Sequence, residues 1–154
     1  MAGDARLKAI PGRDEAMKSR YQLEDQAGFL MRVAMQRHTT IFMSRMIEGL
    51  TQPQFAALAK LLEVGPCSQN QLGRLIYLDG ATIKGVIDRL IARRFVTTQS
   101  DPRDKRRRAI ELSASGRRTA EAAVGIAAGI TAATLSPLTR AEQRAVVRLL
   151  RKLG

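Results

Sequence analysis

The sequence predicts a mainly α-helical protein with one small β-hairpin, and three observations support that prediction. Apolar residues recur at helical spacing through most of the chain, and most of these stretches begin after a Ser, Thr or Asp that can cap a helix. The period changes once, where β-prone residues 95–98 and 109–112 flank a charged turn. We therefore expect one long helix, three short helices, a hairpin and two further helices.

Composition limits the classes of function. The 154 residues suffice for one compact domain, and a formal charge of +12 favours a polyanionic partner, either a nucleic acid or an anionic membrane surface. A single cysteine, Cys67, and a single histidine, His38, leave no disulfide framework, no zinc cluster and no basis for histidine catalysis. We expect no enzymatic activity, cofactor or metal, and a cytoplasmic protein, since no apolar run resembles a signal peptide or membrane span.

The first half of the chain is expected to begin with a mobile arm. Residues 1–20 carry mixed charge and no apolar period, whereas residues 21–154 form the expected single domain. A long helix is predicted over residues 21–48, because Leu30, Ala34, Phe42 and Met46 form an i+4 row that also contains His38. Its apolar content exceeds one stripe, so we expect two of its faces to be covered.

Three short helices follow, each with a start signal. Thr51 with Gln54, and Ser68 with Gln71, have the spacing of a capping box, and Asp79 is placed to cap the third helix. Gly65 and Pro66 end the first of them. The predicted buried positions of the second and third helices are Leu72, Leu75, Ile76, Ile83, Val86, Ile87, Leu90 and Ile91.

The second and third short helices, residues 68–76 and 80–94, form a helix-turn-helix candidate. In this motif the second helix enters the major groove of DNA and presents polar side chains near its N-terminus. The outward positions here are Thr82, Lys84, Gly85, Asp88 and Arg89. Taken alone, the pair fits an ordinary helical bundle equally well.

The predicted hairpin alters that balance. Its loop carries Arg103, Lys105, Arg106, Arg107 and Arg108 within six residues. A charge run of this kind is commonly a solvated face or a disordered tail. Because β-prone segments bracket this one directly after the candidate recognition helix, we interpret it as a wing that lies along DNA phosphates and inserts an arginine into a narrow minor groove.

Three segments carry a family resemblance. DGATIKGVIDRL (79–90), DPRDKRR (101–107) and LSASG (112–116) resemble the signature of the MarR family of winged helix-turn-helix transcription regulators, and the likeness covers residues 21–153. It implies a homodimer in which residues 21–48 and 114–153 dimerise and residues 51–112 read double-stranded DNA. Gly85 departs from the pattern, which often has a polar residue there. The expected DNA-binding residues are Ser68, Gln69, Gln71, Thr82, Lys84, Arg89, Arg103, Lys105, Arg106 and Arg107.

Residues 21–26 and 65–73 are also similar to a proteobacterial branch of this family that includes repressors of nicotinate degradation. That similarity implies an aromatic acid, such as a hydroxylated pyridine carboxylate, as inducer. The candidate ligand-binding residues are Arg37, His38, Phe42, Arg45 and Phe55. The alternative for His38 is a hydrogen-bonded histidine in an interface, and Cys67 is expected to be a structural thiol.

The leading hypothesis is a sequence-specific repressor that a small aromatic acid releases from a pseudo-palindromic operator. Two alternatives remain. One is a DNA-binding regulator or activator without an inducer, and the other is an architectural protein that binds nucleic acid without sequence preference.

Overall fold

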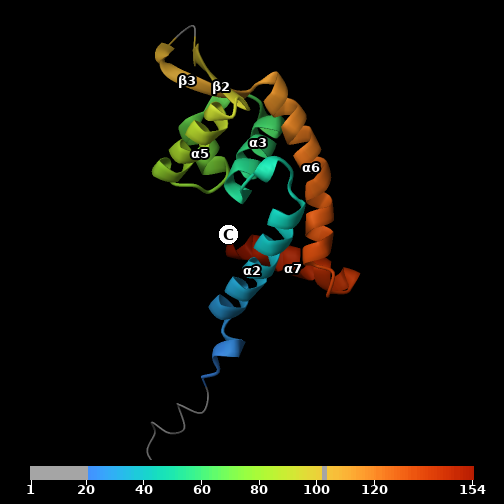
Figure 1. Ribbon diagram of the computed structural model, residues 1–154. Coiled ribbons are helices and arrows are strands. Elements are labelled where there is room, and N and C mark those ends of the chain that lie inside the picture. Colours follow the sequence, from blue (N-terminus) through green and yellow to red (C-terminus); the bar gives the residue numbers. More distant parts are fainter. Residues whose placement is uncertain (1–20, 102–103) are drawn as a thin grey trace, which may run out of the picture. The chain divides into compact units, whose positions relative to one another are not determined.

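The computed structural model describes residues 21–101 and 104–154, and the side chains of residues 101–107 lie outside that description. The predicted mainly helical fold with a small β-sheet is confirmed (Figure 1). The expected mobile arm, residues 1–20, also lies outside the described residues. The elements in order are η1 (Leu23–Asp25), α2 (Ala27–Arg45), η2 (Ile47–Gly49), α3 (Gln52–Val64), β1 (Cys67–Ser68), α4 (Gln69–Leu75), α5 (Gly80–Ala92), β2 (Val96–Asp101), β3 (Asp104–Leu112), α6 (Ala114–Thr134) and α7 (Arg140–Leu153).

The long first helix is shorter than predicted. The contacts divide the chain into two units, residues 1–37 and 38–154, and α2 runs from Ala27 to Arg45 rather than over residues 21–48. Extended backbone at Gln26 (ψ 129°) and Met46 (ψ 138°) bounds it, and Glu48 then takes a left-handed conformation with φ 56°. The apolar period continues past both ends, so periodicity alone overestimated the helix length.

The core of the second unit gathers side chains from the short helices and the sheet. Leu58, Leu72 and Leu90 are fully buried, as are Ile83 and Ile87 of α5. Two predicted core positions are wrong: Leu75 is 38% exposed and Ile91 is 39% exposed.

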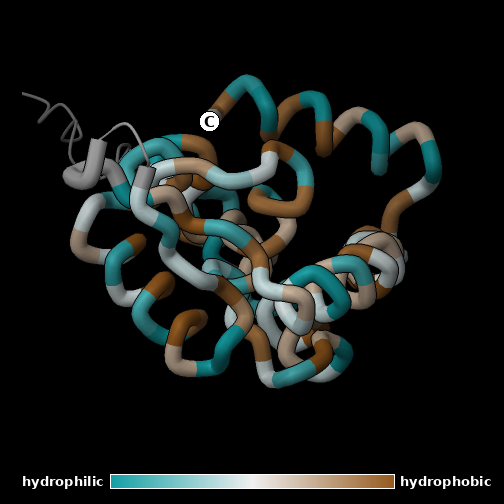
Figure 2. The backbone as a smooth tube through the Cα atoms, turned by 90° about the horizontal axis from the view of Figure 1, so that it is seen from above, coloured by the Kyte–Doolittle hydropathy of each residue, from teal (hydrophilic) through white to brown (hydrophobic). Residues whose placement is uncertain are grey.

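Figure 2 shows hydrophilic and hydrophobic residues alternating along the C-terminal helix, α7. Among the described residues, no helix is long and apolar enough to cross a membrane.

The predicted hairpin is present as part of a three-stranded antiparallel sheet with strand order β1-β3-β2. The hairpin register pairs Val96 with Leu112 and Ser100 with Arg108. Strand β1 was not predicted; it pairs Cys67 with Ile110 and joins the start of α4 to the base of the hairpin. A two-residue strand is too short to leave an alternating pattern in the sequence.

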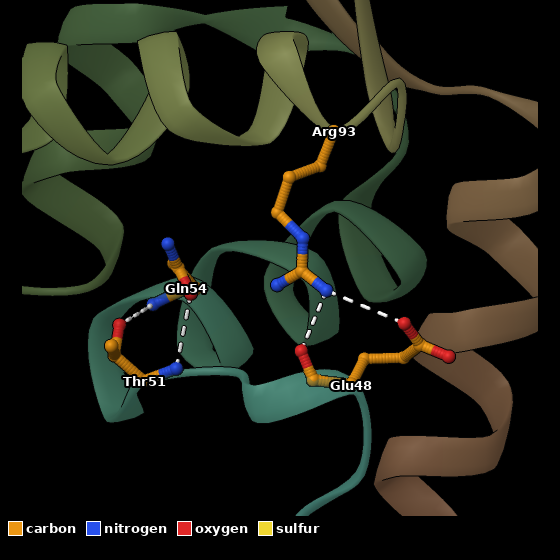
Figure 3. Close-up of polar contacts among 4 residues, drawn as sticks. All are labelled: Glu48, Thr51, Gln54 and Arg93. Carbon is orange, nitrogen blue, oxygen red and sulfur yellow. Dashed lines mark hydrogen bonds and ion pairs between the residues drawn. The ribbon is translucent and has the colours of Figure 1, made fainter.

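The predicted caps position the helices. Thr51 and Gln54 form a reciprocal capping box at the start of α3 (Figure 3), and Thr139 and Glu142 do the same for α7. The Ser68 hydroxyl accepts from the Gln71 N–H at 3.2 Å, so the hydroxyl half of the predicted box caps α4. Each cap satisfies backbone donors that the first turn of a helix leaves unpaired.

Candidate nucleic-acid interface and ligand cavity

Helices α4 and α5 pack closely because of a glycine. A β-carbon at Gly73 would lie 3.1 Å from the Leu78 carbonyl oxygen and 3.2 Å from Cγ2 of Ile83. Glycine therefore lets α4 approach both the turn and the first turn of α5. The result is a compact helix-turn-helix, with residues 76–79 between the two helices.

The N-terminus of α5 is held by Asp79. Its carboxylate accepts from the Thr82 backbone N–H at 2.8 Å and from the Thr82 hydroxyl at 2.7 Å. These hydrogen bonds, the backbone one first, lower the pKa of Asp79, so the capping carboxylate is ionised at neutral pH. Because the hydroxyl proton of Thr82 is used here, the Thr82 oxygen remains as an acceptor for a partner group.

The outer face of α5 carries one internal ion pair. Lys84 Nζ lies 2.6 Å from Asp88 Oδ2, and both side chains are more than half exposed. Such a pair contributes little to folding stability. Arg89 is also exposed, and the space where a Gly85 side chain would stand is open, with Arg89 Nη1 at 4.0 Å. The outer face of α5 therefore presents Lys84, which is paired with Asp88, and Arg89.

The remaining predicted DNA-binding residues lie on α4 and the hairpin. Gln71 is exposed and Gln69 is half-buried on α4, after the Ser68 cap. Lys105, Arg106 and Arg107 belong to β3 by backbone, whereas Arg103 lies outside the described residues. The predicted DNA-binding residues of α4 and α5 are thus exposed or half-buried.

The base of the hairpin is joined to α6 through Ser113. Its backbone N–H donates to the Phe95 carbonyl at 3.0 Å, and its hydroxyl donates to the Arg94 carbonyl at 2.7 Å. The same hydroxyl oxygen accepts from the Gly116 N–H at 3.0 Å and so caps α6. A β-carbon at Gly116 would stand 1.7 Å from the Phe95 carbonyl oxygen, so only glycine fits there. The LSASG segment is therefore a structural junction.

A cavity of about 260 Å³ lies in the second unit, lined by aromatic, apolar and amide side chains. Phe42 and Phe55 meet edge to face with ring centroids 5.9 Å apart, and His38 lies 6.2 Å from Phe42 by the same measure. The lining residues are His38, Phe42, Gln52, Phe55, Ala127, Ile130 and Thr131. The structure thus brings three of the predicted ligand-binding residues together.

The hydrogen bonds of His38 define which ring nitrogen is engaged. Its Nδ1 lies 2.9 Å from Thr134 Oγ1, and Thr134 donates its hydroxyl proton to the Ile130 carbonyl at 2.9 Å. Since that proton is committed, Thr134 accepts from the Nδ1–H of His38. The neutral imidazole is then the tautomer with Nε2 as an acceptor, which becomes a donor on protonation.

The two predicted arginines are not among the lining residues. Arg45 donates to the Gly129 carbonyl at 3.3 Å, and Arg37 is an exposed residue of the first unit. Four lining residues were not predicted: Gln52, which donates to Thr39 at 3.1 Å, and Ala127, Ile130 and Thr131 of α6. The i, i+3, i+4 spacing of those three was the available signal, but the alanine-rich surroundings masked it.

Cys67 is buried and its burial raises the pKa of the thiol. The thiol is therefore protonated at neutral pH, and the thiolate that reactive cysteines need is disfavoured. These observations agree with the structural role expected from the sequence.

Comparison with known proteins gives consistent matches. A family model described as the MarR family matches residues 48–107. The HTH-type transcriptional repressor NicR of Pseudomonas putida is 36% identical over 147 residues, which cover 95% of this chain and 93% of NicR.

Two solved structures are also similar. A probable transcriptional regulator from Pseudomonas aeruginosa superposes with a TM-score of 0.84 at 45% identity, covering 86% of this chain and 100% of that one. Bordetella bronchiseptica BpsR, whose structure is described as a mechanism for regulation of DNA binding by 6-hydroxynicotinic acid, has a TM-score of 0.81 at 39% identity. That match covers 86% of this chain and 96% of BpsR.

Proposed function

Because the chain belongs to the MarR family of transcriptional regulators, we propose that it is a repressor released from a pseudo-palindromic operator by a small aromatic acid. The regulators of this family bind DNA and are not enzymes. The observation that most supports release by a ligand is the cavity against His38, Phe42 and Phe55. We place the protein in the cytoplasm, where its operator would be.

The proposed repressor is a homodimer. Helix α7 has no buried residue in the single chain, and Leu149, Leu150 and Leu153 are 49%, 52% and 74% exposed. Apolar surface of this extent is unfavourable in water, and a second copy would cover it. We assign dimerisation to residues 21–48 and 114–153, and DNA reading to residues 51–112. A two-fold dimer requires half-sites about one helical turn, or ~34 Å, apart.

The inducer we propose is a single-ring aromatic carboxylate, with a hydroxylated pyridine carboxylate as the leading example. The cavity of about 260 Å³ is slightly smaller than the ~300–1,000 Å³ typical of drug-sized ligands, so it suits one ring. Phe42 and Phe55 supply apolar walls, and the imidazole of His38 supplies the polar group that would pair with a carboxylate. BpsR supports this chemistry, since the regulation of its DNA binding is described as acting through 6-hydroxynicotinic acid.

The test is titration of the operator complex with benzoate, salicylate, nicotinate and 6-hydroxynicotinate. One acid should weaken operator binding about 5–150-fold at saturation, corresponding to a coupling free energy of ~1–3 kcal/mol. His38→Ala should abolish that response and keep the affinity for DNA. Arg45→Ala serves as the matched control, because Arg45 is on the same helix but outside the cavity lining.

The outcomes separate the hypotheses. If no acid acts while specific binding persists, the protein is a regulator or activator without such an inducer. If random duplex competes as well as a selected operator, the architectural alternative replaces the repressor. A normal response in His38→Ala would return His38 to the purely structural role that its bond to Thr134 also allows.

A further inference from the structure

Tyr77, in the turn between α4 and α5, has a backbone conformation that favours glycine. Its φ is 57°, in the left-handed region. The Leu78 N–H donates to the Gly73 carbonyl at 2.9 Å, and the Tyr77 N–H approaches the Arg74 carbonyl at 3.4 Å. This is the Schellman pattern of a helix C-terminus, in which the left-handed position is usually glycine. A β-carbon there is sterically unfavourable.

The tyrosine side chain gains nothing from the fold that offsets this strain. It is 87% exposed, more than any other large apolar or aromatic side chain in the described residues. Within the described part of the chain, its hydroxyl has no hydrogen-bond partner. For folding alone, glycine would therefore suit this position better than tyrosine.

The end of α5 offers an informative comparison. Arg94 has φ 59°, and the same pair of hydrogen bonds closes α5, from Phe95 to Leu90 at 3.0 Å and from Arg94 to Ile91 at 2.8 Å. There the left-handed residue is tied into the fold, because its carbonyl accepts from the hydroxyls of Ser113 and Ser115. Among the described residues, no distant element forms hydrogen bonds of this kind with Tyr77.

The place of Tyr77 in the helix-turn-helix suggests what it binds. In this motif the first helix crosses the phosphate backbone and the second enters the major groove, so the turn between them stands beside the backbone. Tyrosine hydroxyls are among the neutral donors that bind phosphate oxygens and fix the register of a protein on DNA. We propose that Tyr77 is an operator-binding residue whose phenolic hydroxyl donates a hydrogen bond to a phosphate at the edge of that groove. This inference rests on DNA binding through α4 and α5.

The experiment uses Tyr77→Phe and Tyr77→Gly, with Arg94→Gly as the matched control for removal of a left-handed side chain. The probe is a duplex that the wild-type protein selects from a random library. Tyr77→Phe should weaken binding about tenfold to every sequence, as expected for a lost hydrogen bond to a charged group. The salt dependence should not change, because no cation is removed. Arg94→Gly removes a cation, so any loss of affinity there should come with a shallower salt dependence.

Thermal unfolding distinguishes a DNA contact from a structural role. Tyr77→Gly should keep or raise Tm, because it relieves the left-handed strain, and yet lose the same DNA affinity as Tyr77→Phe. Wild-type affinity in Tyr77→Phe would overturn the proposal. So would a lower Tm that accounts for the lost binding of Tyr77→Gly, or a changed sequence preference, which indicates a base contact. If the wild-type protein selects no duplex, the DNA-binding function itself fails, whatever the variants do.

Discussion

The guanidinium of Arg93 connects the end of α5 to the turn before α3. Its Nη2 lies 2.6 Å from the Glu48 carbonyl oxygen and 3.4 Å from the Glu48 carboxylate (Figure 3). The same group stands 4.6 Å from the centroid of the Phe95 ring. Glu48 and Gly49 are both left-handed, with φ 56° and 57°, so this side chain stabilises an unusual turn. One arginine thus fixes the end of α5 relative to the segment that leads into α3.

Replacing Arg93 should destabilise the second unit. Arg93→Ala removes the hydrogen bond to the Glu48 carbonyl and the contact with Phe95, and we expect a loss of about 1–3 kcal/mol in the free energy of unfolding. Glu48→Gln is the matched control, since it keeps the carbonyl bond and removes only an exposed ion pair, for which about 0–1 kcal/mol is expected. Urea denaturation at one protein concentration measures both. Equal losses would show that the carboxylate, not the carbonyl, dominates.

Asp79 should make stability depend on pH. Its pKa is lowered in the folded protein, so the ionised cap stabilises the fold above the ordinary aspartate pKa, and that contribution is lost as pH falls through the lowered value. Asp79→Ala should lower Tm by about 2–4 °C at neutral pH. Asp79→Asn keeps a capping oxygen and should be milder, with less loss of Tm between pH 5 and pH 3. An acid response identical to wild type in Asp79→Asn would contradict this role.

Asp88 should restrain the affinity of α5 for DNA. Its carboxylate pairs with Lys84 at 2.6 Å and adds a negative charge to α5, the proposed recognition helix. Asp88→Asn frees Lys84 for a phosphate, which should strengthen binding to all duplexes and steepen the salt slope by about 0.9 units. Glu63→Gln is the matched control, because it breaks the similar pair with Lys60 on α3 and changes net charge equally. Equal gains in both variants would mean that only net charge matters.

Gly116 should tolerate no side chain. Gly116→Ala places a carbon where the Phe95 carbonyl oxygen stands, so the junction between β2 and α6 must separate, at a cost of about 3 kcal/mol or more. Gly125→Ala, in the same helix, has nothing within 4 Å and should stabilise by up to about 1 kcal/mol through helix propensity. Chemical denaturation compares the two. Comparable stability of both alanine variants would show that the junction relaxes easily.

Local signals proved the most predictable part of this fold. The predicted caps at Thr51 and Asp79 are confirmed, because each needs only a side chain and a backbone donor three residues on. Leu75 and Ile91 were assigned to the core wrongly, since periodicity identifies an apolar stripe but not how far a neighbouring element covers it.

The cavity also combines residues that the sequence predicts with residues that depend on how the helices pack. His38, Phe42 and Phe55, predicted as ligand-binding residues from the aromatic pattern of the sequence, all line the cavity. The wall from α6 was not predicted, because its contribution depends on helix packing across more than eighty residues of chain. The charge of Arg45 suits a carboxylate ligand, but the structure pairs Arg45 with the Gly129 carbonyl. The charge of a side chain shows what it can bind, but the packing of the helices determines which group it contacts.

The close approach at Gly116 matters for genetics. If the chain is the repressor proposed above, a mutant screen for constitutive expression of its target genes should recover changes at this codon beside changes in the proposed DNA-binding residues. Both classes should give the same phenotype, but a chain that cannot form the Phe95 junction should be degraded, whereas a variant that loses only a DNA contact should accumulate normally. Immunoblotting of protein abundance would therefore distinguish the two classes of mutant without a DNA-binding assay.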